Sequence, residues 1–456
     1  MTSALDAARV NGTDVVYAEG FPADRDETDE AKFAAAVEAA RAADAAIIFA
    51  GLPDSFESEG YDRSHMRLPE CQDRLIARVA AVQPNTVVVL HNGSPVECPW
   101  AESVNAVLEM YLGGQGVGAA ADALLYGDAN PSGRLPETFP YQLEDNPSHL
   151  NFPGDGKNVE YAEGVFVGYR YYDKKKMAVR WPFGHGLSYT TFEYSNVRVS
   201  ADVLNDGGTV TVYADIKNTG DRAGREVVQL YVADRTGTAG RPEKELKGFA
   251  KVFLAPGESR TVSIALDDKA FRYWNVKTDR WEVEGGSYQL RVGASSADIR
   301  LTAEVSVKGT NAPDPYEGLD LLHYVSGQIS YVTDAEFEAL LGHPIPEDVV
   351  RIDRNITLGE MDHGRSPLGW VAQKVLRCRL DSSFAKGTPD LNTVFQYNMP
   401  LRALAKMTNG MVSMGMVDGL VWELKGFWLV GILRVIYEFV KNLILNSQME
   451  NRLKNS

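Results

Sequence analysis

The apolar run Ala45-Ala46-Ile47-Ile48-Phe49-Ala50-Gly51 and the acidic segment Glu57-Ser58-Glu59-Gly60-Tyr61-Asp62-Arg63 decide how the first part of this chain folds. An unbroken apolar run of this length is typical of a strand buried in a parallel sheet. The acidic segment therefore falls just beyond a strand end, which is where open α/β sheets place their chemistry. The competing interpretation of an acidic, glycine-containing segment is a solvated turn.

Strand and helix signals alternate through residues 1–141. Their order predicts a doubly wound α/β layer. The pattern starts inside a helix with no strand before it, so we expect a partial α/β sandwich that further polypeptide must complete. The expected helices are Ser3–Val10, Ala31–Ala43, Glu70–Val82 and Val117–Leu125, and the apolar strand-like runs are Val15–Tyr17, Ala45–Gly51, Thr86–Leu90 and Ala106–Tyr111.

The rest of the chain divides into three parts of different character. Residues 142–189 are rich in glycine, proline and aromatic side chains, which predicts an ordered aromatic linker across a domain joint. Residues 190–308 alternate apolar and polar positions between turns, which predicts a fibronectin III-like β-sandwich. Residues 309–456 form a helical C-terminal extension, with Met-rich helices such as Met399–Met416. The expected fold class is thus α/β plus all-β with a helical tail.

Composition narrows the function classes. The 456 residues carry a formal net charge of −16, which argues against nucleic acid as a partner. The three cysteines, Cys71, Cys98 and Cys378, are too scattered for a disulfide framework or a metal cluster, so we expect free, buried or semi-buried thiols and no cofactor. The first residues lack the features of a secretion signal, and the expected location is cytoplasmic.

The apolar stretch from Gly426 to Leu445 could be mistaken for a membrane span. Arg434, Glu438 and Lys441 interrupt it on one helical face, which makes a spanning helix costly. We expect an amphipathic helix that docks on the protein's own surface, with peripheral membrane contact as the alternative. The apolar face of this tail could also serve a homo-oligomer.

A succession of motifs resembles glycoside hydrolase family 3 β-glucosidases. The acidic segment, preceded by Gly51-Leu52-Pro53 and followed by Leu68-Pro69, is similar to the acid/base loop of that family. Further matches cover residues 1 to about 308 in the family's order. They are Leu112–Gln115, Leu125–Pro136, Tyr161–Gly164 with Gly168–Tyr172, Phe183–Tyr189 and Lys244–Phe249.

The resemblance implies that the two catalytic residues come from two different domains. In the family, a (β/α)8 barrel carries an aspartate nucleophile and the following α/β sandwich carries the acid/base glutamate. This sequence contains no barrel, which departs from the family plan. By match to the motif, Glu59 takes the acid/base position, and the implied substrate is a β-glucoside or a related glycoside.

Neighbouring residues leave some alternatives open. Glu57 is the rival acid, while Asp62 and Arg63 are expected to be structural partners in the loop, with an ion pair as one arrangement. His65 is expected to be solvated. A general acid needs a raised pKa, which burial or a nearby negative charge provides.

Three hypotheses of function follow. The first is a β-glucosidase-like fragment that supplies Glu59 as acid/base and is inactive alone, because retention needs a second carboxylate. The second is one subunit of a split enzyme that a separate barrel chain completes. The third is a non-catalytic carbohydrate-binding or scaffolding module that uses the aromatic segment 161–189, although that segment is more simply a seam between domains.

Overall fold

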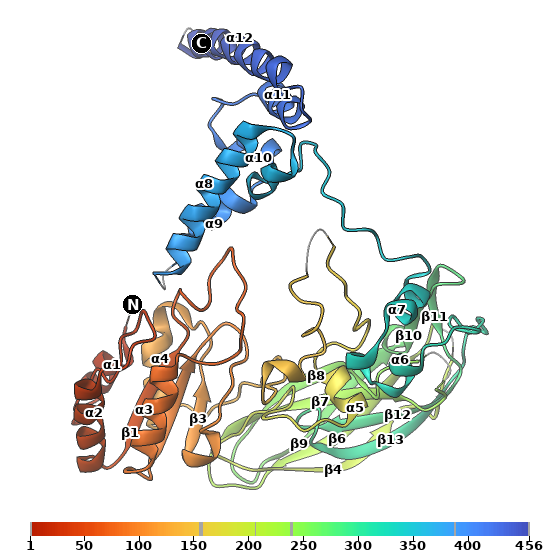
Figure 1. The fold of residues 1–456 in the computed structure, drawn as a ribbon. Helices are drawn as coiled ribbons and strands as arrows, with labels where there is room; N and C mark the ends of the chain where they lie inside the picture. Colours follow the sequence, from red (N-terminus) through yellow and green to blue (C-terminus); the bar gives the residue numbers. More distant parts are fainter. Residues whose placement is uncertain (1, 155–157, 206, 238–239, 387–388, 455–456) are drawn as a thin grey trace.

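The computed structural model describes residues 2–154, 158–205, 207–237, 240–386 and 389–454. Figure 1 shows three regions along the chain: an α/β region, a β-sandwich and a helical tail whose last helices lie apart from both sheets. Mixed α/β, all-β and helical parts agree with the predicted fold class.

The α/β region is built on a short parallel sheet in the order β1-β2-β3. Each predicted helix and each longer strand is present within about three residues of its expected bounds, but Val15–Tyr17 forms no strand and its side chains are largely exposed. The strands are β1 (Ala46–Gly51), β2 (Thr86–His91) and β3 (Ala106–Glu109), and the helices are α1 (Ala4–Val10), α2 (Glu30–Ala42), α3 (Glu70–Ala80) and α4 (Val117–Leu125).

Strand β1 differs from the prediction of a strand buried on both faces. Ile48 and Ala50 are buried, whereas Ile47 and Phe49 are more than a third exposed. The alternation follows from the strand period of two, since only one face packs into the core that contains Phe33 of α2 and Leu75 of α3. The apolar run thus predicted the strand correctly but not its burial.

The β-sandwich has a five-stranded sheet in the order β5-β13-β12-β7-β8 and a three-stranded sheet in the order β4-β6-β9, with a separate β10-β11 hairpin. Inward-facing side chains of both sheets form one apolar core, including Val212, Leu230 and Leu290. The strands are β4 (Phe192–Val199), β5 (Val203–Leu204), β6 (Thr209–Asn218), β7 (Gly224–Asp234), β8 (Glu245–Leu254), β9 (Ser259–Asp267), β10 (Arg272–Asn275), β11 (Arg280–Val283), β12 (Gly286–Gly293) and β13 (Ile299–Val307).

A buried ion pair joins the α/β region to the sandwich. Arg134 donates from Nη2 to both carboxylate oxygens of Glu226 on β7, at 3.0 and 3.1 Å, and both side chains are less than a tenth exposed. The hydroxyl of Tyr194 on β4 donates to the same carboxylate at 3.0 Å. Asn130 adds a second link, donating from Nδ2 to the Ala223 carbonyl and accepting from the Tyr189 N–H.

The aromatic segment is a packing seam. Phe166, Tyr171 and Tyr172 are buried, the tyrosines on helix α5 (Tyr169–Lys175), and they share a core with Leu321 and Tyr324. This burial removes these three rings from any sugar-binding surface.

The tail contains seven α-helices among the described residues. The Met-rich stretch is not continuous: α10 ends at Met407, and Asn409 and Gly410 at positive φ turn the chain before α11. The helices are α6 (Leu322–Ser326), α7 (Asp334–Leu341), α8 (Pro367–Phe384), α9 (Leu391–Asn398), α10 (Leu401–Met407), α11 (Met414–Leu424) and α12 (Trp428–Lys454).

The structure also bears on the expectations for the cysteines and for a membrane span. Cys71 and Cys98 are buried free thiols as expected, but Cys378 is exposed on α8. No helix in the described ranges is both long and apolar enough to cross a bilayer.

Replacing Arg134 with alanine should destabilise the joint strongly. The change leaves the Glu226 carboxylate buried without its cation, which costs about 3–5 kcal/mol in free energy of unfolding. Urea denaturation measures the loss. The matched control is Arg260→Ala, which removes an exposed pair with Glu258 and should cost less than about 1 kcal/mol. Equal losses in the two variants would contradict this account of the joint.

Candidate active site

The acidic segment begins where β1 ends, and the end of β1 is held from two sides. Gln72 of α3 accepts from the Gly51 N–H and donates to the Gly51 carbonyl, both at 2.9 Å. The Leu52 N–H donates to the His91 carbonyl at the end of β2. The chain then turns at Pro53, whose carbonyl accepts from the N–H groups of Phe56 and Glu57. The loop therefore leaves a rigid strand end.

Glu59 stands at the tip of a tight turn. Ser58 and Tyr61 form an isolated antiparallel bridge, which places Glu59 and Gly60 at the two central positions. Gly60 has φ of 102°, a conformation that residues with a side chain rarely adopt. The Glu59 side chain is exposed, and no hydrogen-bond partner for it exists within the described part of the chain. The turn thus presents this carboxyl group outward.

Glu57 and Arg63 hold the two sides of this turn to the loop that follows β2. The Glu57 carboxylate accepts from the Gly93 N–H at 2.7 Å and from Ser94 Oγ at 3.2 Å. Arg63 donates to the same Ser94 Oγ at 2.6 Å and to the Pro95 carbonyl at 3.2 Å. A Cβ on Gly93 would lie 2.7 Å from a Glu57 oxygen, so a larger residue there would require the carboxylate to move. Both anchors meet on Ser94.

Arg63 holds the loop as expected, but two details differ from the predictions. Asp62 is exposed and makes no ion pair with Arg63, because the guanidinium points instead to Ser94 and Pro95. His65 is not simply solvated. Its ring packs edge-on against Phe56, and burial lowers its pKa.

A second layer of carboxyl groups lies at the same edge of the sheet. Glu109, the last residue of β3, accepts from the Tyr111 N–H at 2.8 Å and from Asn92 Nδ2 at 3.3 Å. Burial raises the pKa of Glu109 to about 7 despite these two donors. The Tyr111 hydroxyl donates to Glu137 at 3.3 Å, and burial also raises the pKa of Glu137.

Sequence reasoning missed this second layer. Glu109 is a charged residue at the end of an apolar strand, next to Tyr111, and that position was the available signal. Tyr111 has φ of 47°, which no apolar pattern predicts. Asn92 and Glu137 carry no comparable local signal, because the fold alone brings them together.

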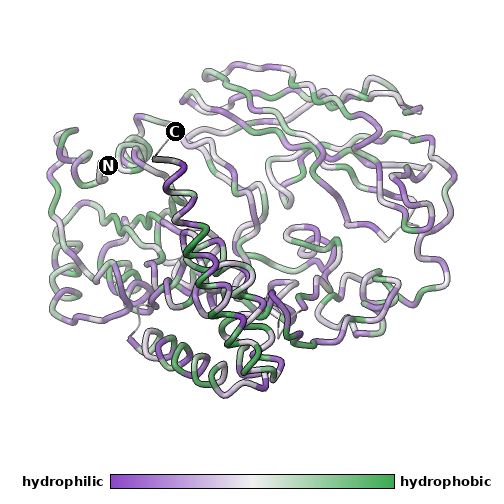
Figure 2. Tube along the Cα trace, turned by 90° about the horizontal axis from the view of Figure 1, so that it is seen from above, coloured by the Kyte–Doolittle hydropathy of each residue, from purple (hydrophilic) through white to green (hydrophobic). Residues whose placement is uncertain are grey.

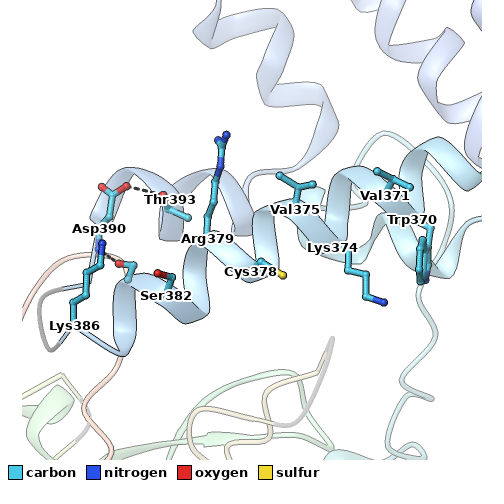
Figure 3. Close-up of a pocket in the computed structure, with 11 residues that line it drawn as sticks. Trp370, Val371, Lys374, Val375, Cys378, Arg379, Ser382, Lys386, Asp390 and Thr393 are labelled. Carbon is cyan, nitrogen blue, oxygen red and sulfur yellow. Dashed lines mark hydrogen bonds between the residues drawn. The ribbon is translucent and has the colours of Figure 1, made fainter.

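The helical tail also contacts the turn. The rings of Tyr61 and Phe384 lie edge to face with centroids 6.1 Å apart, and a Cβ on Gly60 would lie 3.8 Å from Val394 of α9. An open groove of about 810 Å³ runs along α8 and α9 from Trp370 to Asp390 (Figure 3). The Lys374 ammonium group lies over the Trp370 ring there.

The chain combines an α/β layer, which has an acidic loop at its strand ends, with a fibronectin-like sandwich. Known proteins share this two-domain arrangement. Residues 2–189 match the glycosyl hydrolase family 3 C-terminal domain, and residues 226–296 match the fibronectin type III-like domain. The chain thus carries the C-terminal domain of glycoside hydrolase family 3, followed by the fibronectin type III-like domain, as the C-terminal portion of a family 3 protein does.

Individual relatives agree with this assignment. Thermostable β-glucosidase B of Acetivibrio thermocellus is 54% identical over 296 residues, which cover 65% of this chain and 39% of that protein. An exo-α-(1→6)-L-arabinopyranosidase of Bifidobacterium breve is 46% identical over 69% of this chain and 41% of its own length. The crystal structure of a Bifidobacterium adolescentis family 3 β-glucosidase matches with a TM-score of 0.66 at 43% identity, covering 74% of this chain and 48% of that one. The chain thus spans about two fifths of the length of these curated relatives.

Replacing Glu109 with glutamine should change how stability depends on pH. The Glu109 pKa is about 7 in the folded chain against an ordinary 4.5, so the folded state holds this proton more tightly. The stability that the carboxyl group contributes is fully present below pH 4.5 and is lost as pH rises through 7. Glu109→Gln should therefore exceed the wild type by about 1–3 kcal/mol in free energy of unfolding at pH 8 and match it near pH 4.5.

Urea denaturation at the two pH values measures this difference. Glu38→Gln, on the exposed face of α2, is the matched control and should track the wild type at both. A Glu109→Gln difference that stays constant with pH would contradict the buried, raised-pKa carboxyl group.

Proposed function

We propose that this chain supplies the general acid/base of a retaining β-glucosidase-type glycosidase, with Glu59 in that role. The observation that carries the proposal is the position of Glu59, an outward-facing carboxyl group at the tip of a turn that Glu57 and Arg63 anchor to Ser94. The family motif supports the same residue. Glu57 is the weaker candidate, because two donors occupy its carboxylate and hold it against the loop after β2.

The chemistry assigns Glu59 two successive proton transfers. In the first step, its carboxylic acid donates a proton to the glycosidic oxygen while a carboxylate nucleophile attacks the anomeric carbon. In the second step, the Glu59 carboxylate takes a proton from the water that hydrolyses the glycosyl-enzyme. The nucleophile must lie about 5–5.5 Å from the acid/base in such an enzyme.

We further propose that a (β/α)8 barrel provides this nucleophile, either in the same polypeptide or as a separate chain. The described residues contain no such barrel, and the chain spans about two fifths of the length of its curated relatives. Purified 1–456 should therefore be inactive or nearly so. A cytoplasmic location and self-association through the tail are further parts of this proposal.

The proposed substrate is a terminal β-D-glucoside. Thermostable β-glucosidase B, at 54% identity, supports that sugar. The similarity to exo-α-(1→6)-L-arabinopyranosidases, at 45–46% identity, supports α-L-arabinopyranoside as the second candidate. Paired assays with p-nitrophenyl β-D-glucoside and p-nitrophenyl α-L-arabinopyranoside distinguish the two.

A chimera tests the assignment of Glu59. Residues 1–308 replace the matching part of thermostable β-glucosidase B, whose remaining sequence is kept. We expect the chimera to hydrolyse p-nitrophenyl β-D-glucoside, and Glu59→Gln to lower kcat by about 10²–10⁴-fold, as loss of a general acid/base does. The matched control Glu57→Gln keeps an oxygen acceptor for Gly93 and should retain most of the activity.

Two results would contradict the proposal. One is a chimera in which Glu57→Gln abolishes turnover and Glu59→Gln does not. The other is purified 1–456 that hydrolyses the aryl glucoside by itself with a turnover that Glu59→Ala leaves unchanged.

A further inference from the structure

Helix α12 carries its apolar side chains on the outside. Eight of them form a line that we call the apolar stripe, and each is more than half exposed. Figure 2 shows hydrophobic residues recurring along this last helix, with hydrophilic residues predominating toward the C-terminus. The stripe consists of Leu429, Val430, Leu433, Ile436, Tyr437, Val440, Leu443 and Ile444.

The opposite face of α12 is fully used within the tail. Gly431 packs so close to α11 that a Cβ there would lie 2.5 Å from the Gly419 carbonyl oxygen. Glu438 is buried against Gly415, and Asn442 donates to the Gly410 carbonyl at 2.6 Å. The tail helix does dock on the protein, as the sequence predicted, but through small and polar positions together with Val435, which contacts Gly419 of α11. Its apolar face remains uncovered.

The spacing of the stripe is that of a coiled-coil seam. Leu429, Leu433, Ile436, Val440 and Leu443 are separated by four, three, four and three residues, an average of 3.5. Val430, Tyr437 and Ile444 flank this seam at seven-residue intervals. Such a pattern suits another helix with the same period, because knobs from one seam fill holes in the other.

Charge favours a protein partner over a lipid surface. Along the apolar stripe the cations are Arg434 and Lys441, and both pair with Glu438 at 3.4 Å, whereas Arg452 and Lys454 follow beyond the stripe at the end of α12. Arg434 and Lys441 are therefore engaged, whereas an amphipathic membrane helix presents free cations to lipid headgroups. The net charge of −16 further opposes an anionic membrane.

We infer that the occupant of the stripe is a second copy of this chain, with α12 packed on α12. The stripe contains no charged residue, so two copies can meet there without opposing like charges. Eight side chains of this size, each more than half exposed, offer about 800 Å², which is the area that each partner buries in a stable standard interface. Together with α11 of each copy, the pair forms a four-helix bundle.

Light scattering after size exclusion tests this inference on the full 1–456 chain. We expect a mass of twice 50.1 kDa at micromolar concentration. The double substitution Leu433→Glu with Ile436→Glu should give the monomer mass, because it places charges in the seam. Both side chains are exposed, so circular dichroism should show unchanged helix content. Gln448→Glu adds a charge to the same helix outside the stripe and should leave the dimer intact.

Several outcomes would overturn the inference. These are a monomeric wild type, a dimer that survives the double substitution, and a dimer that Gln448→Glu also dissolves. Co-sedimentation of the wild type with vesicles of phosphatidylcholine and phosphatidylglycerol, lost in the double variant, would make a membrane the occupant instead. A one-to-one complex with a family 3 barrel chain, lost in the same variant, would assign the stripe to that partner.

Discussion

The hydrogen bonds that join Glu57 and Arg63 to the loop after β2 fix the position of the turn that carries Glu59. The proposed proton transfer depends on that position. Both anchors converge on Ser94, one from each side of the turn that carries Glu59. The loop they bind leaves the end of β2, and the turn leaves the end of β1, so two parallel strands set the position of one carboxyl group. Without these hydrogen bonds, a glutamate on a glycine-containing turn would sample many orientations. Efficient proton transfer requires the carboxyl group to hold a single orientation toward the substrate.

The remaining architecture supports that edge of the sheet. Gln72 closes the end of β1, and the half-buried Glu109 and Glu137 lie near it, linked through Asn92 and Tyr111. The Arg134–Glu226 pair fixes the α/β region to the sandwich, which keeps the edge in a constant relation to the rest of the chain. The tail reaches the turn through Phe384 and Val394, and its first helix packs on the aromatic segment through Leu321 and Tyr324. Its later helices build a core of their own.

The sequence predicted the helices and strands well, but it predicted poorly which side chains contact each other. The strands at 46–51 and 86–91 follow from their apolar runs, although only one face of the first strand is buried. The partners of Arg63 could not be predicted, since Ser94 and Pro95 are about thirty residues away and only the fold brings them close. For a related reason the sequence left two alternatives open for the apolar face of α12, docking on the protein's own surface or serving a homo-oligomer. Periodicity reveals two faces of a helix, but which face packs depends on the glycines of α11.

The most direct measurement of the central claim is the product that the Glu59→Ala chimera forms in azide. Azide attacks a glycosyl-enzyme without needing a general base, so it should restore turnover that water cannot support when Glu59 is absent. Two inversions at the anomeric carbon predict β-glucosyl azide, which NMR identifies. A rate that azide leaves unchanged, or an α-configured azide product, would contradict the role of Glu59 as acid/base in double displacement.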